Sequence, residues 1–320
     1  MFKVSTEKIS NWILVTGAIR SGTTFLGTVL SMPRSVDYIH EPLNPQCGIS
    51  EIREPHRYIR SDLTSAESHP YHRYIESIFD YNFKLKGYYP AADPIPSKLL
   101  KRLVGSRGPY HLRLAKLNPS HSAAIIKDPH SVLLCEYFYS IFRVKPVIIV
   151  KHPVSFIASL KRVGWWPSPL EIADQPDLIS DYFLEEKHFL KQKWATPLEQ
   201  SAAFWRAIHK VILSQSSKYA DWLIVKHEDL SKDPVFTFRS LYSQLDLPWN
   251  SRIEAAIISQ TMKSKSPRAK RGKIQDFKRN SAAIFEANRS TITVEERQKI
   301  FDIVKDVALQ LYTKETFLLE

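Results

Sequence analysis

Cysteine is scarce in this sequence. Only Cys47 and Cys135 occur, and they form neither a CxxC motif nor any metal-ligand spacing. A disulfide framework is therefore not expected, and a reducing compartment is the expected environment. His69 and His72 lie near each other in a polar stretch, but nothing beside them completes the ligand set of a metal ion. We predict a protein without a metal site.

Long apolar runs are also absent. No window approaches 18 apolar residues, whereas a helix needs about 20 to cross a bilayer. Residues 1–11 lack the hydrophobic run of a signal peptide. We therefore expect no transmembrane segment and a cytoplasmic location, with peripheral contact at a membrane surface left open. The sequence gives no indication of the oligomeric state.

Acidic residues are outnumbered by basic ones, 33 to 45, which gives a net charge of +12. This excess favours anionic partners such as nucleotides, nucleic acid, acidic glycans or lipid headgroups, without choosing among them. The chain has 320 residues, of which 43% are hydrophobic and 24% are charged. These values suit one large α/β domain or at most two modest ones.

Short apolar runs alternate with helical patterns along the chain. We expect strands at residues 12–16, 36–39, 124–126, 146–150 and 222–225, and helices at 23–31, 132–142, 154–162, 236–245 and 293–311. The alternation predicts an α/β, three-layer P-loop-like fold with a central parallel sheet flanked by helices. We expect a single domain over residues 1–320. The stretches at about 48–117 and 164–197 interrupt the alternation and are either insertions that cover the substrate or peripheral helices that complete the core.

A phosphate-binding loop is predicted at residues 17–24, which read Gly-Ala-Ile-Arg-Ser-Gly-Thr-Thr between a strand and a helix. The loop nearly fits the Walker A pattern GxxxxGK[ST], whose backbone N–H groups hold phosphates at a helix N-terminus. Thr23 occupies the Walker A lysine position, and the cation is Arg20 instead. Because a nucleoside triphosphatase needs that lysine together with magnesium, the loop indicates an anionic ligand of another geometry. An ordinary helix cap is the alternative.

This loop resembles the 5'-phosphosulfate loop of sulfotransferases that use 3'-phosphoadenosine 5'-phosphosulfate (PAPS), in the Arg version common among bacterial, tyrosylprotein and glycan-modifying members. The resemblance implies that Arg20 faces the bridging oxygen and the sulfuryl group being transferred. It also implies that the 5'-phosphate is bound by Ser21, Gly22, Thr23, Thr24 and Phe25. A sulfuryl group carries less charge than a phosphoryl group, so a cationic side chain and N–H dipoles can suffice without a metal.

A second motif resembles the family's 3'-phosphate element, a strand that ends in Arg with a Ser eight residues later. Here Lys151 follows the strand and Ser159 is eight residues on. Eight residues of turn and helix span on the order of 10 Å, so one phosphate could lie between them. Lys in place of Arg keeps the charge but loses the planar donor geometry.

Two more motifs occur in the order that the family has. Residues 226–234 resemble its Tyr-Glu-Asp-Leu…Pro segment, with His227 in place of Tyr, and we interpret Glu228 as structural. Residues 270–278 resemble a basic-Gly segment that folds over the 3'-phosphate and adenine, which implies that Arg271 and Gly272 bind the nucleotide. A solvated basic loop is the alternative for this last motif.

The catalytic residues are predicted from the strand ends nearest these motifs. Sulfuryl transfer needs a base for the acceptor's proton and a cation for the departing oxygen. Lys127-Asp128-Pro129-His130 resembles the Lys-Ser-Pro version of Golgi glycan sulfotransferases, which implies that Lys127 is a second cation and that a Glu is the base. We expect Glu41 to be this base, with His40 and His130 as further candidates.

The acceptor is predicted to be a hydroxyl or amine, of a glycan or polysaccharide precursor in the first place. Aromatic residues between 58 and 110 and at 165–166 suit sugar rings, although they would also suit an aromatic small molecule. We expect no nucleic acid partner. Alternatives are a P-loop kinase that uses ATP, with Asp128 on magnesium, a basic polyanion-binding module at residues 263–279, and an inactive sulfotransferase-like scaffold.

Overall fold

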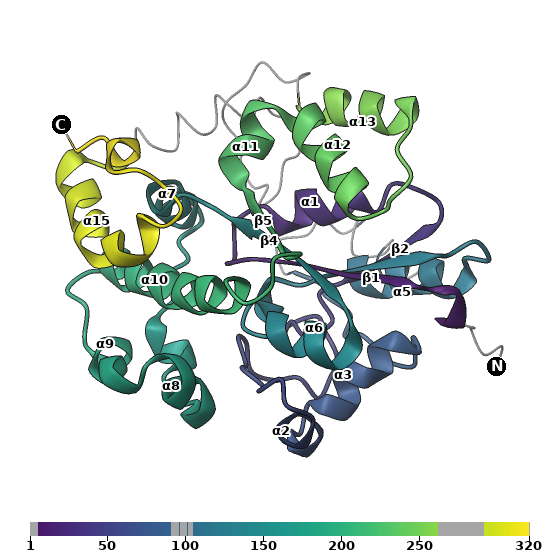
Figure 1. Cartoon of the computed structure of the whole chain (residues 1–320), viewed down its shortest axis with the longest axis horizontal. Helices are drawn as coiled ribbons and strands as arrows, with labels where there is room; N and C mark the ends of the chain where they lie inside the picture. The colour runs from purple at the N-terminus through teal and green to yellow at the C-terminus, as the bar shows by residue number, and fades with distance from the viewer. Residues whose placement is uncertain (1–5, 91–95, 97–100, 102–104, 262–290, 320) are drawn as a thin grey trace. The chain divides into compact units, whose positions relative to one another are not determined.

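A computed structural model describes residues 6–90, 96, 101, 105–261 and 291–319 (Figure 1). The chain forms two compact units, and we describe each by itself. The first contains residues 1–17, 26–148 and 221–223, and the second contains residues 18–25, 149–220 and 224–320. The motif at residues 270–278, with Arg271 and Gly272, lies outside the described residues.

The central sheet has five strands in the order β2–β3–β1–β4–β5. Their bounds are Asn11–Thr16 for β1, Val36–His40 for β2, Ala123–Lys127 for β3, Lys145–Val150 for β4 and Leu223–Lys226 for β5. β1 is parallel to both β3 and β4, and β2 is parallel to β3. β2 and β3 are buried along their whole length, as strands covered by helices on both faces require. The predicted α/β fold with a central parallel sheet is confirmed.

In the first unit, helices cover both faces of the sheet. Helix α1 (Thr23–Leu30) lies on one face, where its Gly27 approaches the side chains of Lys127 and Tyr38. Helix α6 (Cys135–Phe142) lies on the other face (Figure 1). It begins three residues later than predicted, because Asp128 accepts a hydrogen bond from the His130 N–H and caps a separate 3-10 turn, Pro129–Ser131.

The predicted interruption at 48–117 contains helices α2 (Leu63–Ser68), α3 (His72–Phe79) and α5 (Arg107–Leu117). Helix α3 packs into the core of the first unit: Phe79 stacks on Phe142 of α6 with 4.5 Å between ring centres and lies edge-on to Trp12 of β1 at 4.8 Å. At least this part of the stretch therefore completes the core. A role of the stretch in covering substrate stays a prediction.

The second unit is built around the long helix α10 (Pro197–Ser216), which packs against α15 (Val294–Ala308) and α7 (Pro153–Val163). Pro153 lies in the first turn of α7, as predicted, and Thr293 and Glu296 form the predicted capping box of α15. The remaining helices are α8 (Pro176–Tyr182), α9 (Lys187–Lys191), α11 (His227–Lys232), α12 (Pro234–Gln244) and α13 (Ser251–Thr261). Short 3-10 turns lie at Thr6–Lys8, Pro169–Ile172, Leu184–Glu186 and Lys314–Phe317. Within the described parts of the chain, no helix has both the length and the apolar character needed to cross a bilayer.

Candidate active site

Several of the predicted site residues that the structure describes lie at or just after the carboxyl ends of strands. Residues 17–24 follow β1, Glu41 follows β2, Lys127 ends β3, and Lys151 and His227 directly follow β4 and β5. In α/β sheets, ligands bind outside the carboxyl ends of the strands, where the strand order changes direction. β1, from which the loop leaves, lies between β3 and β4, so the strand order reverses beside it.

Residues 18–24 of the predicted phosphate loop lie in the second unit and have an unusual backbone. Arg20 has a φ of 65° and Gly22 a φ of 105°, a region that residues other than glycine rarely adopt. A Cβ atom at Gly22 would lie 3.1 Å from Cδ2 of His227 and 3.3 Å from Cδ1 of Ile149. Glycine is therefore required at position 22 both by the backbone and by the lack of space.

Polar groups of this loop suit an anion. The Oγ atom of Ser21 is buried and has no hydrogen-bond partner among the described residues, and a buried hydroxyl normally has one. Thr23 and Thr24 open helix α1, whose first N–H groups have no partner within the helix. The donors present therefore fit the 5'-phosphate of a nucleotide.

Arg20 is held beside an aromatic ring of the same unit. Its guanidinium carbon lies 5.7 Å from the ring centre of Trp165, within the range of a cation–π contact. Phe25 packs edge-on against Phe238 of α12, with 5.5 Å between ring centres. Contact of Phe25 with a nucleotide, which the loop resemblance implies, stays a prediction.

The predicted 3'-phosphate residues are buried in the second unit, with 4% of Lys151 and 4% of Ser159 exposed. The carbonyl oxygen of Lys151 accepts a hydrogen bond from the indole of Trp205. Burial and the charge of Lys151 hold the pKa of His227 well below its usual value. His227 is also the side chain that a Cβ atom at Gly22 would approach most closely, so it neighbours both Lys151 and the predicted phosphate loop.

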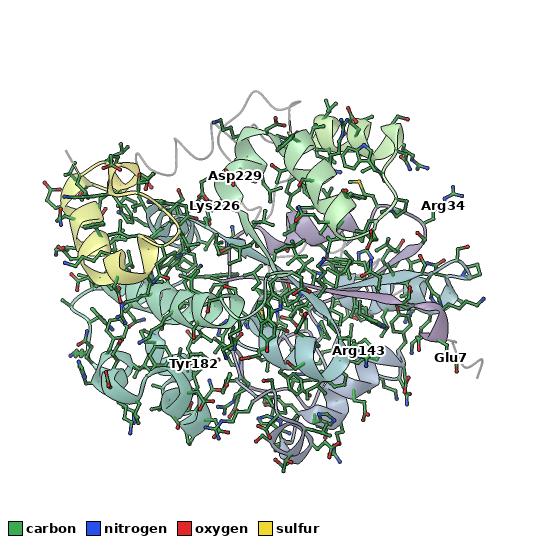
Figure 2. All side chains as sticks on the ribbon, in the orientation of Figure 1. Glu7, Arg34, Arg143, Tyr182, Lys226 and Asp229 are labelled. Carbon is green, nitrogen blue, oxygen red and sulfur yellow. The ribbon has the colours of Figure 1, made fainter. Side chains whose placement is uncertain are left out.

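Glu228 has the structural role that its motif predicted. One carboxylate oxygen accepts a hydrogen bond of 3.1 Å from the backbone N–H of His152, and the other accepts one of 3.1 Å from the Tyr312 hydroxyl. Glu228 thereby ties the turn after β4 to the C-terminal part of the chain. Glu228 is located in Figure 2 by the labels of Lys226 and Asp229, which precede and follow it in the sequence at the start of α11.

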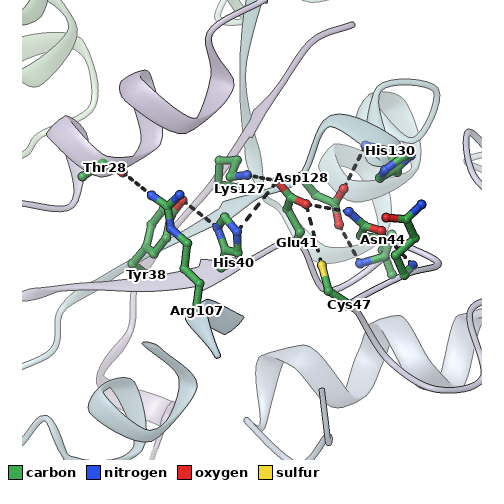
Figure 3. Close-up of polar contacts among 12 residues, drawn as sticks. Thr28, Tyr38, His40, Glu41, Asn44, Cys47, Arg107, Lys127, Asp128 and His130 are labelled. Carbon is green, nitrogen blue, oxygen red and sulfur yellow. Dashed lines mark hydrogen bonds and ion pairs between the residues drawn. The ribbon is translucent and has the colours of Figure 1, made fainter. Parts of the chain in front are cut away.

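A buried ion pair lies in the first unit (Figure 3). The ammonium group of Lys127 donates a hydrogen bond to Oε1 of Glu41, and the Lys127 side chain is fully buried. Oε2 of Glu41 accepts a hydrogen bond of 2.6 Å from Asn44. Glu41 also has a left-handed backbone, with a φ of 50°, and such strained positions occur often at functional sites.

The pKa of Glu41 is set by opposing influences. Burial alone would raise this pKa, but the charge of Lys127, the nearby His40 and hydrogen bonds from Lys127 and Asn44 lower it to about 2. Glu41 is therefore ionised at neutral pH. In this state it is a weak base, since an effective general base has a pKa near the working pH.

The two histidine candidates for the base are held neutral. Burial, together with the charge of Lys127, keeps the pKa of His40 well below its usual value. Burial and the neighbouring His56, whose ring centre is 5.0 Å away, lower the pKa of His130 to about 3. Nδ1 of His40 is 3.0 Å from the Tyr38 hydroxyl, which occupies one of its two ring nitrogens.

Asp128 is fully buried near the Lys127–Glu41 ion pair. Its pKa is raised to about 7 by burial and by the charge of Glu41. Its two oxygens accept hydrogen bonds of 2.6 Å from the N–H of Leu43 and 2.8 Å from the N–H of His130. Both oxygens are therefore engaged in holding backbone, so Asp128 fixes the loop that carries Glu41. Among the described residues, no three His, Cys, Asp or Glu side chains form a group that could hold a metal ion.

Comparison with known proteins finds similar structures. No protein-family model and no curated protein matches the sequence. One similar structure is the sulfotransferase domain from the curacin biosynthetic pathway, with 15% identity, a TM-score of 0.43 and coverage of 86% of this chain and 83% of that one. Another is sulfotransferase STF1 from Mycobacterium tuberculosis H37Rv, with 16% identity, a TM-score of 0.41 and coverage of 89% and 77%.

A third similar structure is mouse sulfotransferase SULT7A1 complexed with PAP, with 15% identity, a TM-score of 0.42 and coverage of 99% of this chain and 94% of that one. The chain is similar to sulfotransferases. At these identities the sulfotransferases assign neither an acceptor nor a role to any residue of this chain.

Asn44 and Gly27 were not singled out from the sequence, and Asp128 was considered there only as the magnesium ligand of a kinase. Asn44 lies three residues after Glu41 and bonds it, and Asp128 holds the same loop. Gly27 lies against Lys127 in the middle of a helix. The sequence could have indicated Asn44, which lies three residues after Glu41, and Gly27, which interrupts a helical pattern. The hydrogen bond from the Leu43 N–H to Asp128 could not be predicted, because it joins segments 85 residues apart in the sequence.

Proposed function

We propose that the chain is a sulfotransferase that moves the sulfuryl group of PAPS to a hydroxyl or amine of an acceptor. The observation that carries the proposal is the loop at residues 17–24. It follows a buried strand and opens a helix, it has Arg20 as its cation in place of the Walker A lysine, and its buried Ser21 hydroxyl has no hydrogen-bond partner in the part of the chain that the structure describes.

In this proposal, the second unit binds the nucleotide. The N–H groups at the start of α1 and the hydroxyls of Ser21, Thr23 and Thr24 bind the 5'-phosphate, because a helix N-terminus favours negative charge. Lys151 and Ser159 bind the 3'-phosphate. The position of Lys151 directly after β4 supports this role, because ligands of α/β sheets bind beyond the carboxyl ends of the strands.

The chemical step needs a proton acceptor and stabilisation of the leaving group. The acceptor oxygen forms a bond to sulfur while the bond from sulfur to the bridging oxygen breaks, and the products are the sulfated acceptor and 3'-phosphoadenosine 5'-phosphate. Glu41 takes the acceptor's proton, and Arg20 and Lys127 stabilise the negative charge that develops on the bridging oxygen. When Lys127 interacts with the donor instead, it no longer offsets the effect of burial, so the pKa of Glu41 rises and the carboxylate becomes a better base.

We propose a carbohydrate as the acceptor. The first unit contains a cavity of about 510 Å³ whose lining includes tyrosines, arginines and carboxylates of residues 51–74. Arg73 lies over the ring of Tyr74, with 4.6 Å from its guanidinium carbon to the ring centre. Aromatic faces and charged groups suit a polyhydroxylated ligand, and the net charge of +12 supports an acidic glycan.

The function is tested by the ligand that stabilises the protein. We expect 3'-phosphoadenosine 5'-phosphate to raise the Tm, and ATP with magnesium to leave it unchanged. Arg20→Ala should abolish sulfuryl transfer. Arg143→Ala is a matched control, because Arg143 also has a left-handed backbone (φ 54°) but lies exposed at the end of α6, as labelled in Figure 2.

Stabilisation by ATP with magnesium alone would identify a kinase and reject the proposal. Binding of heparin that depends steeply on salt and is unaffected by Arg20→Ala, without any effect of the nucleotide, would identify a polyanion-binding module instead.

A further inference from the structure

Helix α1 has a buried glycine, Gly27, in its interior. Glycine destabilises a helix interior relative to alanine. The backbone does not require glycine here, because Gly27 is not among the residues with positive φ. A reason for glycine at this position must therefore come from the neighbouring side chains.

The neighbours leave no room for a Cβ atom at position 27. That atom would lie 2.8 Å from Cγ and 3.1 Å from Cβ of Lys127, and 3.2 Å from Cε2 of Tyr38. The first two contacts involve the root of the lysine side chain and not its flexible end. Rotation of the ammonium group alone could not relieve them, so the whole side chain would have to move.

Both neighbours are fixed by polar contacts of their own. The Lys127 side chain is fully buried and its ammonium group pairs with Glu41. The Tyr38 hydroxyl lies 3.0 Å from Nδ1 of His40. The added methyl group would therefore push on the Lys127 side chain, because Tyr38 leaves it no room on the other side. The displaced Lys127 would then lose its ion pair with Glu41.

We propose that Gly27 is a positioning residue for the transfer reaction, because its missing side chain provides the path along which Lys127 reaches Glu41. Gly27 acts through Lys127 and touches neither donor nor acceptor. Its role in transfer rests on the proposed function, whereas its effect on the ion pair does not.

The test is Gly27→Ala, with the Glu41 carboxyl followed by carbon-13 NMR as the pH is varied. In the unchanged protein this carboxyl should stay ionised below 4.5, its ordinary pKa, because Lys127 pairs with it. In the variant it should titrate above 4.5, since burial then acts without the ion pair. Val29→Ala removes part of a fully buried side chain from the same helix and should leave the titration unchanged. An unchanged titration in Gly27→Ala would overturn the proposal.

If Gly27→Ala is too unstable for NMR, the free energy of unfolding in two backgrounds tests the same proposal. If Lys127 is the obstacle, Gly27→Ala should destabilise the protein strongly, but much less in the background of Lys127→Ala, which removes the closest contact, the one with Cγ of Lys127. An equal loss of stability in both backgrounds would overturn the proposal. Neither measurement needs activity, so a chain that lacks sulfuryl transfer would refute the proposed function while the role of Gly27 in the ion pair is still decided. In an active protein, Gly27→Ala should also shift the acid limb of the kcat profile to higher pH.

Discussion

The indole nitrogen of Trp205 donates a hydrogen bond of 2.9 Å to the carbonyl oxygen of Lys151. Trp205 is fully buried in α10, the central helix of the second unit. The turn that carries Lys151 is therefore fixed from one side by α10 and from the other by Glu228, which accepts the N–H of His152. A lysine on such a rigid support is suited to bind a phosphate at a defined place.

Lys151→Ala should weaken binding of 3'-phosphoadenosine 5'-phosphate by roughly 10- to 100-fold, the value of one hydrogen bond to a charged group. Binding of adenosine 5'-phosphosulfate, which lacks the 3'-phosphate, should not change. Isothermal titration calorimetry with the two ligands separates these outcomes. Lys161→Ala is a control that removes a lysine from α7, the helix after Lys151. The Lys161 side chain is 42% exposed and pairs with Glu296. An equal loss of affinity for both ligands would show that Lys151 does not bind the 3'-phosphate.

Glu41→Gln should lower turnover by about 10²–10⁴-fold, the usual contribution of a general base. The affinity for 3'-phosphoadenosine 5'-phosphate should stay near normal, because the predicted nucleotide residues belong to other segments. The variant should also be less stable, since it leaves the ammonium group of the buried Lys127 without its carboxylate. Initial rates, calorimetry and urea unfolding measure the three effects, with the exposed Glu54→Gln as a control.

A loss of nucleotide binding in Glu41→Gln, with turnover of the remaining complex unchanged, would make Glu41 a structural residue. His40→Gln and His130→Gln tested in the same way would then identify the base.

Acid sensitivity should arise partly from His209. This residue is fully buried in α10, stacks on Trp205 with 3.9 Å between ring centres, and has its pKa lowered to about 4 by burial. Because the pKa is lower in the folded protein than the usual 6.5, the unfolded chain binds the proton first, and stability falls as the pH decreases below 6.5. At pH 5 the loss should be about 2 kcal/mol.

Urea unfolding at pH 8 and pH 5 measures this loss. His209→Phe keeps the stacking on Trp205 but cannot bind a proton, so its stability should fall by about 2 kcal/mol less between the two pH values than that of the unchanged protein. An equal fall in both proteins would show that other groups cause the acid sensitivity.

The sequence was sufficient for the parallel sheet and for the strand ends that carry the motifs. Continuous apolar runs such as 124–126 and the capping signals of Pro153 and Thr293 act locally, so they can be read without a structure. The pairing of Lys127 with Glu41 was not predicted, although each residue was. It depends on β2 and β3 being neighbours in register, with His40 opposite Lys127, and strand order is not encoded in any local pattern.

The start of α6 shows the same limit at a smaller scale. The helical pattern was expected from residue 132, but the turn that Asp128 caps through the N–H of His130 comes first and α6 begins only at Cys135. The contact of Arg20 with Trp165 also joins two distant segments. The proposed roles of Arg20, Glu41 and Lys127 in transfer remain predictions.

The left-handed backbone at Arg20 and Glu41 has a consequence for protein engineering. Glycine would relax each position by about 1–2 kcal/mol, because it has no Cβ to clash with the chain. A search for heat-resistant variants by backbone geometry alone would therefore select positions 20 and 41 early. At position 41 the relaxation would be offset by leaving the buried Lys127 without its carboxylate, whereas at position 20 a gain in stability would remove the cation that we assign to the chemistry.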